Sequence, residues 1–162
     1  MALLDVTDLS VTFVHRGAPP VHAVDGVSFT VDEGEVVGLV GESGCGKSVT
    51  SLAIMGLLPR RGVRVGGRAV FAGRDLLTLD DDARRDIRGR EIAMIFQDPL
   101  SSLNPVVPIG VQVAEVLVRH RKLERAQARR QAAELLERVG IPDPQRRLRE
   151  YPHQLSGGMR QR

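Results

Sequence analysis

The chain of 162 residues has no tryptophan, one cysteine and only 3% aromatic residues. The single cysteine, Cys45, excludes an internal disulfide, so the chain is not a disulfide-stapled scaffold. The longest mostly apolar run, Leu52 to Leu58, is far shorter than the roughly 18 apolar residues that cross a bilayer. Asp5 and Asp8 stand where a secretory signal would carry cations. We therefore expect neither a membrane span nor a signal peptide.

The chain also has little net charge. Lys plus Arg number 23 against 20 Asp plus Glu, a net charge of +3, and hydrophobic residues make up 42% of the chain, which are ordinary globular values. The isoelectric point of 9.7 is high because nearly all of the cations are arginine. Few aromatic residues and no recognisable DNA- or RNA-binding motif accompany the charge, so we expect a folded domain that binds no nucleic acid.

Strand patterns occupy much of the first half of the chain. Near alternation of apolar residues over 3–14 and 27–31 predicts two strands, and residues 63–72 predict another with a bulge or turn at a double glycine. Short continuous apolar runs at 36–40 and 92–96 predict strands buried on both faces. The first half is therefore predicted to be rich in strands.

Helical spacing follows a glycine-rich segment and dominates the second half. Residues 48–58 predict one helix, and the acidic residues 80–82 predict the first turn of a short surface helix. Two more helices are predicted from Ile109 and from Ala126, the second ending before Gly140. Their expected buried positions are Ile109, Val113, Val116 and Leu117 in the first helix and Ala128, Ala132, Leu135, Leu136 and Val139 in the second. Prolines then predict an extended stretch over 142–152.

The segment GESGCGKS, residues 41–48, matches the phosphate-binding loop pattern and lies between a predicted strand and a predicted helix. Its glycines allow backbone N–H groups to wrap an anion at the helix N-terminus. Lys47 would reach the β and γ phosphates of a nucleotide, and the Ser48 hydroxyl would hold Mg²⁺. A plain glycine turn is the alternative, but it needs no Lys-Ser pair. The predicted nucleotide-contacting residues of this segment are Gly41, Glu42, Ser43, Gly44, Cys45, Gly46, Lys47, Ser48 and Val49.

A phosphate-binding loop alone fits GTPases, kinases, helicases and transporters. Three further segments narrow the choice: AVDGVSF at 23–29, EIAMIFQDPLSSLNP at 91–105 and YPHQLSGGMRQR at 151–162. With these, the chain resembles the ATPase subunits of ABC importers, in particular the dipeptide, oligopeptide and nickel permease group. The resemblance covers essentially the whole chain. It implies an α/β fold: residues 1–97 form an antiparallel β layer plus the phosphate-loop core, and residues 98–162 form a helical subdomain ending at the signature motif.

The resemblance also implies roles for residues outside the phosphate-binding loop. Ser156, Gly157 and Gly158 would close over the γ-phosphate of ATP held by a partner subunit. Gln97 would reach Mg²⁺ or the attacking water, and Phe13 would stack on adenine. The plain alternatives are a turn at the signature, a solvent-facing Gln97 and a Phe13 that belongs to the core.

The function implied is that of an ATPase subunit that binds ATP and Mg²⁺ and energises import of peptides or related solutes, nickel among them. Its partners would be a second ATPase subunit and two membrane permease subunits, with an extracytoplasmic solute-binding protein acting indirectly. Its place would be the cytoplasmic face of the cell membrane, as a peripheral protein. The alternatives are a nucleotide-binding remnant that does not hydrolyse ATP and a soluble ABC protein of DNA repair or translation.

The family pattern continues beyond what this sequence contains. No segment matches the Walker B strand with its general-base glutamate, and the four histidines all precede the place of the switch histidine. We therefore expect the sequence to stop before Walker B. Since the missing strands would lie in the sheet centre, apolar faces should remain exposed. Without the glutamate, the chain alone should bind nucleotide weakly and hydrolyse it at background rate.

Overall fold

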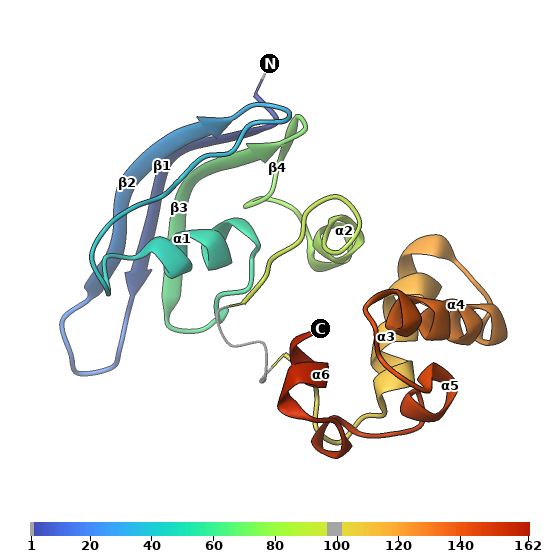
Figure 1. Ribbon diagram of the computed structural model, residues 1–162. Helices are drawn as coiled ribbons and strands as arrows, with labels where there is room; N and C mark the ends of the chain where they lie inside the picture. The colour runs from blue at the N-terminus through green and yellow to red at the C-terminus, as the bar shows by residue number, and fades with distance from the viewer. Residues whose placement is uncertain (1, 97–101) are drawn as a thin grey trace. The chain divides into compact units, whose positions relative to one another are not determined.

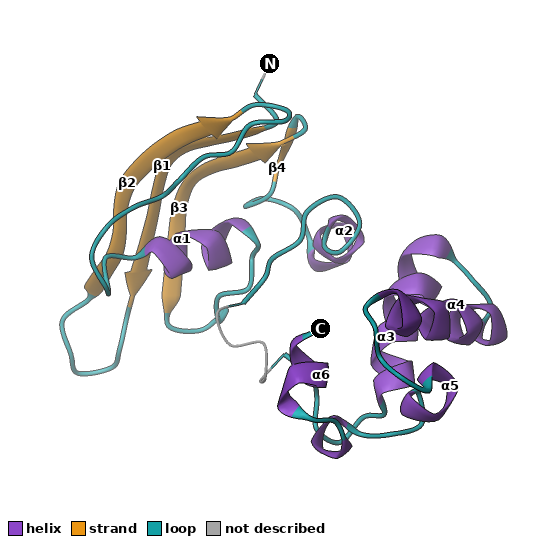
Figure 2. Ribbon diagram, in the orientation of Figure 1, coloured by secondary structure: helices purple, strands orange, loops and turns teal. Residues whose placement is uncertain are grey.

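The computed structural model describes residues 2–96 and 102–162. The chain divides into two compact units, residues 1–88 and 89–162, each with its own internal contacts. Figure 2 shows that the strands belong to the first unit, whereas helices dominate the second. None of the helices in the described ranges is both long and apolar enough to cross a membrane.

The first unit is built on a four-stranded antiparallel sheet with the strand order β2-β1-β3-β4 (Figure 1). The strands are β1 (Leu4–Phe13), β2 (Val21–Val31), β3 (Val63–Phe71) and β4 (Arg74–Asp75). The predicted antiparallel layer is thereby confirmed. β2 is longer than the predicted strand because its first residues also pair with the end of β1.

The double glycine in β3 lies opposite an irregularity in β1. The β1–β3 register shifts between Thr7 and Ser10, and Asp8 within that shift has a positive φ of 49°. Gly67 has a φ of 90°, and a Cβ added there would collide with the Asp8 carbonyl oxygen. Only glycine fits this close approach of two backbones, so the predicted bulge is confirmed.

One apolar cluster holds the first unit together. Helix α1 (Lys47–Ile54) contacts β1 and β2 and buries Ala53 and Ile54. Helix α2 (Asp81–Ile87) begins as predicted, because the Asp80 carboxylate accepts a hydrogen bond of 2.8 Å from the Ala83 N–H. The sheet residues of the core are Val6, Leu9, Val11, Val24, Ala69 and Phe71.

The predicted strands at 36–40 and 92–96 are wrong for this structure. A strand is held by the backbone of a neighbouring strand, and β1 to β4 pair with one another rather than with either segment. Val36, Val40 and Ile95 are therefore 96%, 94% and 97% exposed. The expectation that apolar residues would remain exposed is confirmed by the same side chains.

The second unit is helical, as predicted. It comprises α3 (Ile109–Arg121), α4 (Arg125–Arg138), α5 (Pro144–Arg147), the 3-10 helix η1 (Pro152–Gln154) and α6 (Gly157–Gln161). The prediction of an extended stretch over 142–152 is wrong, because proline is tolerated in the first turn of a helix, where its missing N–H is not needed. The core residues are Ile109, Ala132, Ala133, Leu136, Ile141, Leu148 and Leu155.

The buried faces of α3 and α4 are narrower than predicted. Val116, Leu135 and Val139 are exposed, whereas Gly110 is buried. A Cβ added to Gly110 would lie 2.5 Å from the Leu148 carbonyl oxygen, and the Gly110 N–H donates a 3.0 Å hydrogen bond to that oxygen. Because the backbones touch here, a residue without a side chain forms part of the packing face.

Candidate functional site

The phosphate-binding loop leads directly into α1, which begins at Lys47. Gly44 and Gly46 both have positive φ, 85° and 92°, which favours glycine over any residue with a side chain. Gly46 is the N-cap, and no side chain caps this end of the helix. The N–H groups of the first turn and the positive end of the helix dipole are therefore available to an anion.

The loop is seated tightly on β2. A Cβ added to Gly46 would collide with the Ala23 carbonyl oxygen and lie 3.4 Å from Cγ2 of Val24. From the other side, the Thr50 N–H and hydroxyl both donate to the Gly46 carbonyl oxygen, at 2.8 and 3.0 Å. Thr50 is buried, and these bonds hold the Gly46 carbonyl in the first turn of α1.

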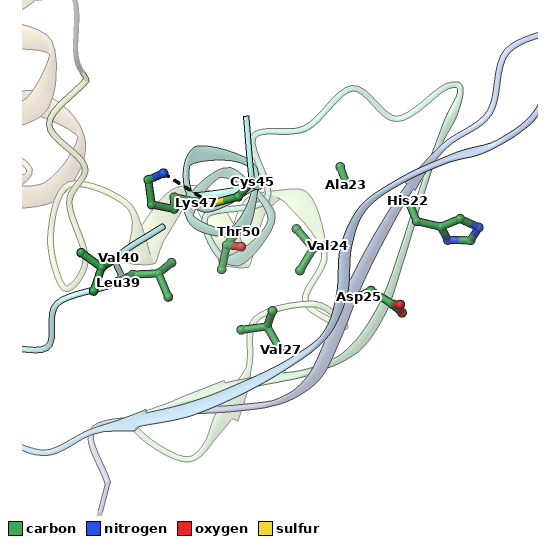
Figure 3. Close-up of a pocket in the computed structure, with 10 residues that line it drawn as sticks. All are labelled: His22, Ala23, Val24, Asp25, Val27, Leu39, Val40, Cys45, Lys47 and Thr50. Atoms are coloured by element: carbon green, nitrogen blue, oxygen red, sulfur yellow. Dashed lines mark hydrogen bonds between the residues drawn. The ribbon is translucent and has the colours of Figure 1, made fainter. Parts of the chain in front are cut away.

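The Lys47 ammonium lies across the loop. Its Nζ donates hydrogen bonds of 2.7 Å to the Gly41 carbonyl and 2.6 Å to the Glu42 carbonyl. The same Nζ lies 3.4 Å from the Cys45 Sγ (Figure 3). Both carbonyls belong to exposed residues. A phosphate carries full negative charge and forms stronger hydrogen bonds with an ammonium than a neutral carbonyl does. The lysine is therefore positioned to exchange loop carbonyls for an anion.

A pocket of about 380 Å³ lies between β2 and the start of α1. Lys47, Cys45 and Thr50 line it from the loop and helix, and Ala23 and Val24 line it from β2 (Figure 3). The pocket thus places a cation next to apolar surface, which suits a ligand with an anionic end and an apolar or aromatic part. Ala23, Val24 and Thr50 were not predicted as site residues. The AVDGVSF segment was the signal that could have indicated the first two.

The remaining predicted residues of this site have different placements. Ser48 and Val49 follow Lys47 in the first turn of α1, and Ser48 is exposed. Phe13 ends β1, where it pairs with Val21 and Val63, and it does not line the pocket. Gln97 lies outside the described residues.

The Ser48 hydroxyl suits Mg²⁺. Magnesium takes oxygen ligands and is bound by one or two protein groups, with substrate phosphates and water completing its octahedron. An exposed hydroxyl in the first turn beside the loop therefore fits this ion. Among the described residues there is no group of three His, Cys, Asp or Glu that could hold a metal by itself.

The predicted signature residues lie in the second unit. Ser156 is the N-cap of α6, and its Oγ accepts a 3.3 Å hydrogen bond from the Met159 N–H. Gly157 and Gly158 are exposed, and a Cβ added to either would meet nothing within 4 Å. Packing against the described residues therefore does not require glycine at these positions, and the backbone is open to close approach by another group.

Two arginine clusters support the structure around these sites. The Arg88 guanidinium donates hydrogen bonds to the Met55 and Gly56 carbonyls at the end of α1, and burial, with Arg84 nearby, lowers its pKa. In the second unit, the Arg147 Nη1 donates a 2.7 Å hydrogen bond to the Glu150 Oε2. This bond lowers the pKa of the Glu150 carboxyl.

Curated relatives match almost the whole chain. It is 52% identical over 161 residues to the dipeptide transport ATP-binding protein DppD of Bacillus subtilis, covering 99% of this chain and 48% of that protein. It is 50% identical to the oligopeptide transport ATP-binding protein OppD of Bacillus subtilis, covering 99% and 45%. For DppD of Escherichia coli K12 the identity is 52%, covering 100% and 49%. The chain thus spans about half the length of these relatives.

Solved structures and a family model agree with this likeness. The ATP-binding cassette MJ0796, solved as a dimer in a post-hydrolysis state with ADP and Pi, superposes with a TM-score of 0.77 at 26% identity, covering 98% of this chain and 65% of that one. The cbiO1 protein of Clostridium perfringens, part of the ABC transporter complex cbiONQ, gives a TM-score of 0.62 at 23% identity, covering 98% and 57%. The ABC transporter family model matches residues 24–162. The chain belongs to the ABC transporter family and has the α/β fold of its ATPases.

Proposed function

We propose that this chain is part of an ATP-binding subunit that energises the import of peptides or related solutes. The observation that carries the proposal is the start of α1, where Lys47 and an uncapped helix end face a glycine-rich loop. Half of the residues are shared with DppD and OppD, whose names state dipeptide and oligopeptide transport. These names support peptides as the solute class.

The triphosphate of ATP would lie on the phosphate-binding loop. The N–H groups from Gly44 to Val49 would donate to its oxygens, and Lys47 would leave the Gly41 and Glu42 carbonyls to bind the β and γ phosphates. Phe13 would stack on adenine near the end of β1. Ser48 and Gln97 would hold Mg²⁺, which when bound neutralises charge that develops on the phosphates.

The signature residues would act between subunits. The Ser156 hydroxyl accepts a bond from Met159 but keeps its own proton, which can be donated to a γ-phosphate held by a second ATPase subunit. Gly157 and Gly158 would add backbone N–H groups. This assembly implies two permease subunits in the membrane and a solute-binding protein outside, with the ATPase peripheral at the cytoplasmic face. Residues 1–97 would hold the nucleotide, and residues 98–162 would form the helical subdomain.

Titration with ATP tests the proposal most directly. Removal of the charge in Lys47→Gln should weaken ATP binding by roughly ten- to a hundredfold, since a hydrogen bond to a charged group contributes about 1.5–3 kcal/mol. The exposed Arg61 provides the matched control, because Arg61→Gln removes an equal charge from the same unit. Cells in which Lys47→Gln is placed in the ATP-binding subunit that contains this sequence should also lose uptake of a labelled dipeptide, and cells with Arg61→Gln should keep it. Equal ATP affinity or equal uptake in both variants would refute the proposal.

A further inference from the structure

The corner between α3 and α4, residues 119–130, concentrates positive charge. It carries six cations and a single carboxylate, that of Glu124, and all six cations are exposed. We call this segment the cationic corner. Its cations are Arg119, Arg121, Lys122, Arg125, Arg129 and Arg130.

The stability of the two helices explains only part of this charge. Arg119 and Arg121 lie in the last turn of α3, where the negative end of the helix dipole favours cations. Arg125 is the first residue of α4 and lies at the positive end of that helix dipole. The first turn of α4 carries no acidic residue. The N-cap of α4, Glu124, makes no side-chain capping bond there. A cation at this end opposes the dipole, so its presence suggests a role other than folding.

Ion pairing in the described part of the chain leaves most of this charge unused. Within residues 2–96 and 102–162, the five cations from Arg121 to Arg130 make no ion pair. By contrast, Arg146 and Arg147 further along the same unit both pair with Glu150. The charge of these five side chains is therefore presented to solvent.

The backbone keeps these charges together. Lys122 has a left-handed conformation with φ of 54°, which turns the chain sharply between α3 and α4. Arg125 and Arg129 are four residues apart on α4, so they share one face of the helix. The two helices contact each other, which fixes the corner as one surface rather than a flexible tail.

We propose that the cationic corner binds the anionic headgroups of a lipid bilayer. Long arginine side chains on adjoining helix ends can reach several phosphates at once. Val116 and Val118, just before the corner, are exposed apolar residues suited to the headgroup boundary. Nucleic acid is a poorer fit because the corner contains no Phe, Tyr or Trp on which bases could stack. The inference rests on the proposed function in taking the chain to work at a membrane.

Sedimentation of the chain with lipid vesicles tests the proposal. Vesicles with about a third phosphatidylglycerol in phosphatidylcholine should bind the chain, and vesicles of phosphatidylcholine alone should not. The triple variant R125Q, R129Q and R130Q should lose roughly a hundredfold in affinity, since each cation near an anionic surface contributes about fivefold. Binding should also weaken as salt is raised.

A matched control removes equal charge elsewhere. R16Q, R61Q and R149Q change three exposed arginines outside the corner and should leave vesicle binding within about threefold of the original chain. Equal losses in the two triple variants would overturn the proposal, because net charge alone would then explain binding. Equal binding to neutral vesicles would overturn it as well. A duplex DNA bound more tightly than the anionic vesicles, and lost with the corner variant, would assign the surface to nucleic acid instead.

Measurement of ATP affinity on the same samples separates this proposal from the proposed function. The corner variant should bind ATP as the original chain does, and its thermal unfolding midpoint should not fall, because the replaced side chains are exposed. ATP binding without vesicle binding would overturn the proposal that the cationic corner binds lipid and would leave the proposed nucleotide site unaffected. Vesicle binding without ATP binding would overturn the proposed function alone.

Discussion

Replacement of Arg88 by alanine should destabilise the first unit through the end of α1. The guanidinium Nε and Nη2 donate to the Met55 and Gly56 carbonyls over 2.7 and 2.6 Å, across 33 and 32 residues of sequence. Each charge-assisted bond contributes about 1.5–3 kcal/mol when its removal leaves a buried partner unpaired. Arg88 is only partly buried, so water can reach these carbonyls in the variant. We therefore expect a loss of about 2–3 kcal/mol, near the lower limit for two bonds.

Urea unfolding of Arg88→Ala, followed by far-ultraviolet circular dichroism, gives the free energy of unfolding. Hydrogen exchange should place the effect at the last turn of α1, where the amides should lose protection first. Arg85→Ala is the matched control, because Arg85 lies in the last turn of α2, just before its C-cap Arg88, and among the described residues its ion pair is the exposed one with Asp82. Such pairs contribute about 0–1 kcal/mol. If Arg88→Ala lowers the free energy of unfolding by no more than Arg85→Ala does, the two hydrogen bonds of Arg88 do not stabilise α1.

Two further substitutions test the second unit. Gly110→Ala should lower the thermal midpoint of this unit, because the added Cβ would lie 2.5 Å from the Leu148 carbonyl oxygen and overpacking costs about 1–3 kcal/mol. Gly158→Ala, in the same unit and with nothing within 4 Å of its Cβ, should not lower it. Glu150→Gln should flatten the acid limb of stability. The folded-state pKa of Glu150 is lowered by Arg147, so its contribution is present above the usual value of 4.5 and is lost as pH falls through the lowered pKa. Parallel stability curves for the two proteins below pH 5 would contradict this.

Local patterns predicted the elements whose own residues carry the periodicity or the cap. The β1 to β3 layer alternates in its own sequence, and the Asp80 cap and the Gly67 bulge depend on neighbours a few residues away or directly across a strand pair. The strand predictions for 36–40 and 92–96 were wrong because an apolar run indicates only that a strand there could be buried. The run does not indicate whether a neighbouring strand is present to supply its hydrogen bonds.

The same distinction applies to the candidate site. The sequence predicted the loop and its lysine, since both belong to one contiguous motif. The sequence could not predict that the Gly46 backbone lies against the Ala23 carbonyl, or that the Thr50 hydroxyl donates to the Gly46 carbonyl. The hydrogen bonds of Arg88 join residues more than thirty positions apart. Nothing in the sequence around a single arginine indicates which distant carbonyl it binds. The contacts of Gly46 with Ala23 and of Arg88 with Met55 join distant segments, and these required the structure.

The two predicted phosphate-contacting motifs differ in how their helices are capped, and the difference bears on the order in which they would bind. The N-cap of α1 is Gly46, which offers no side chain to the first-turn N–H groups, so an anion there satisfies donors that lack a partner from a capping side chain. The N-cap of α6 is Ser156, whose Oγ already accepts from the Met159 N–H. Less binding energy is gained where a donor already has a partner. We therefore expect the phosphate-binding loop to take nucleotide first, with the Ser156 hydroxyl proton adding its bond to a phosphate already held.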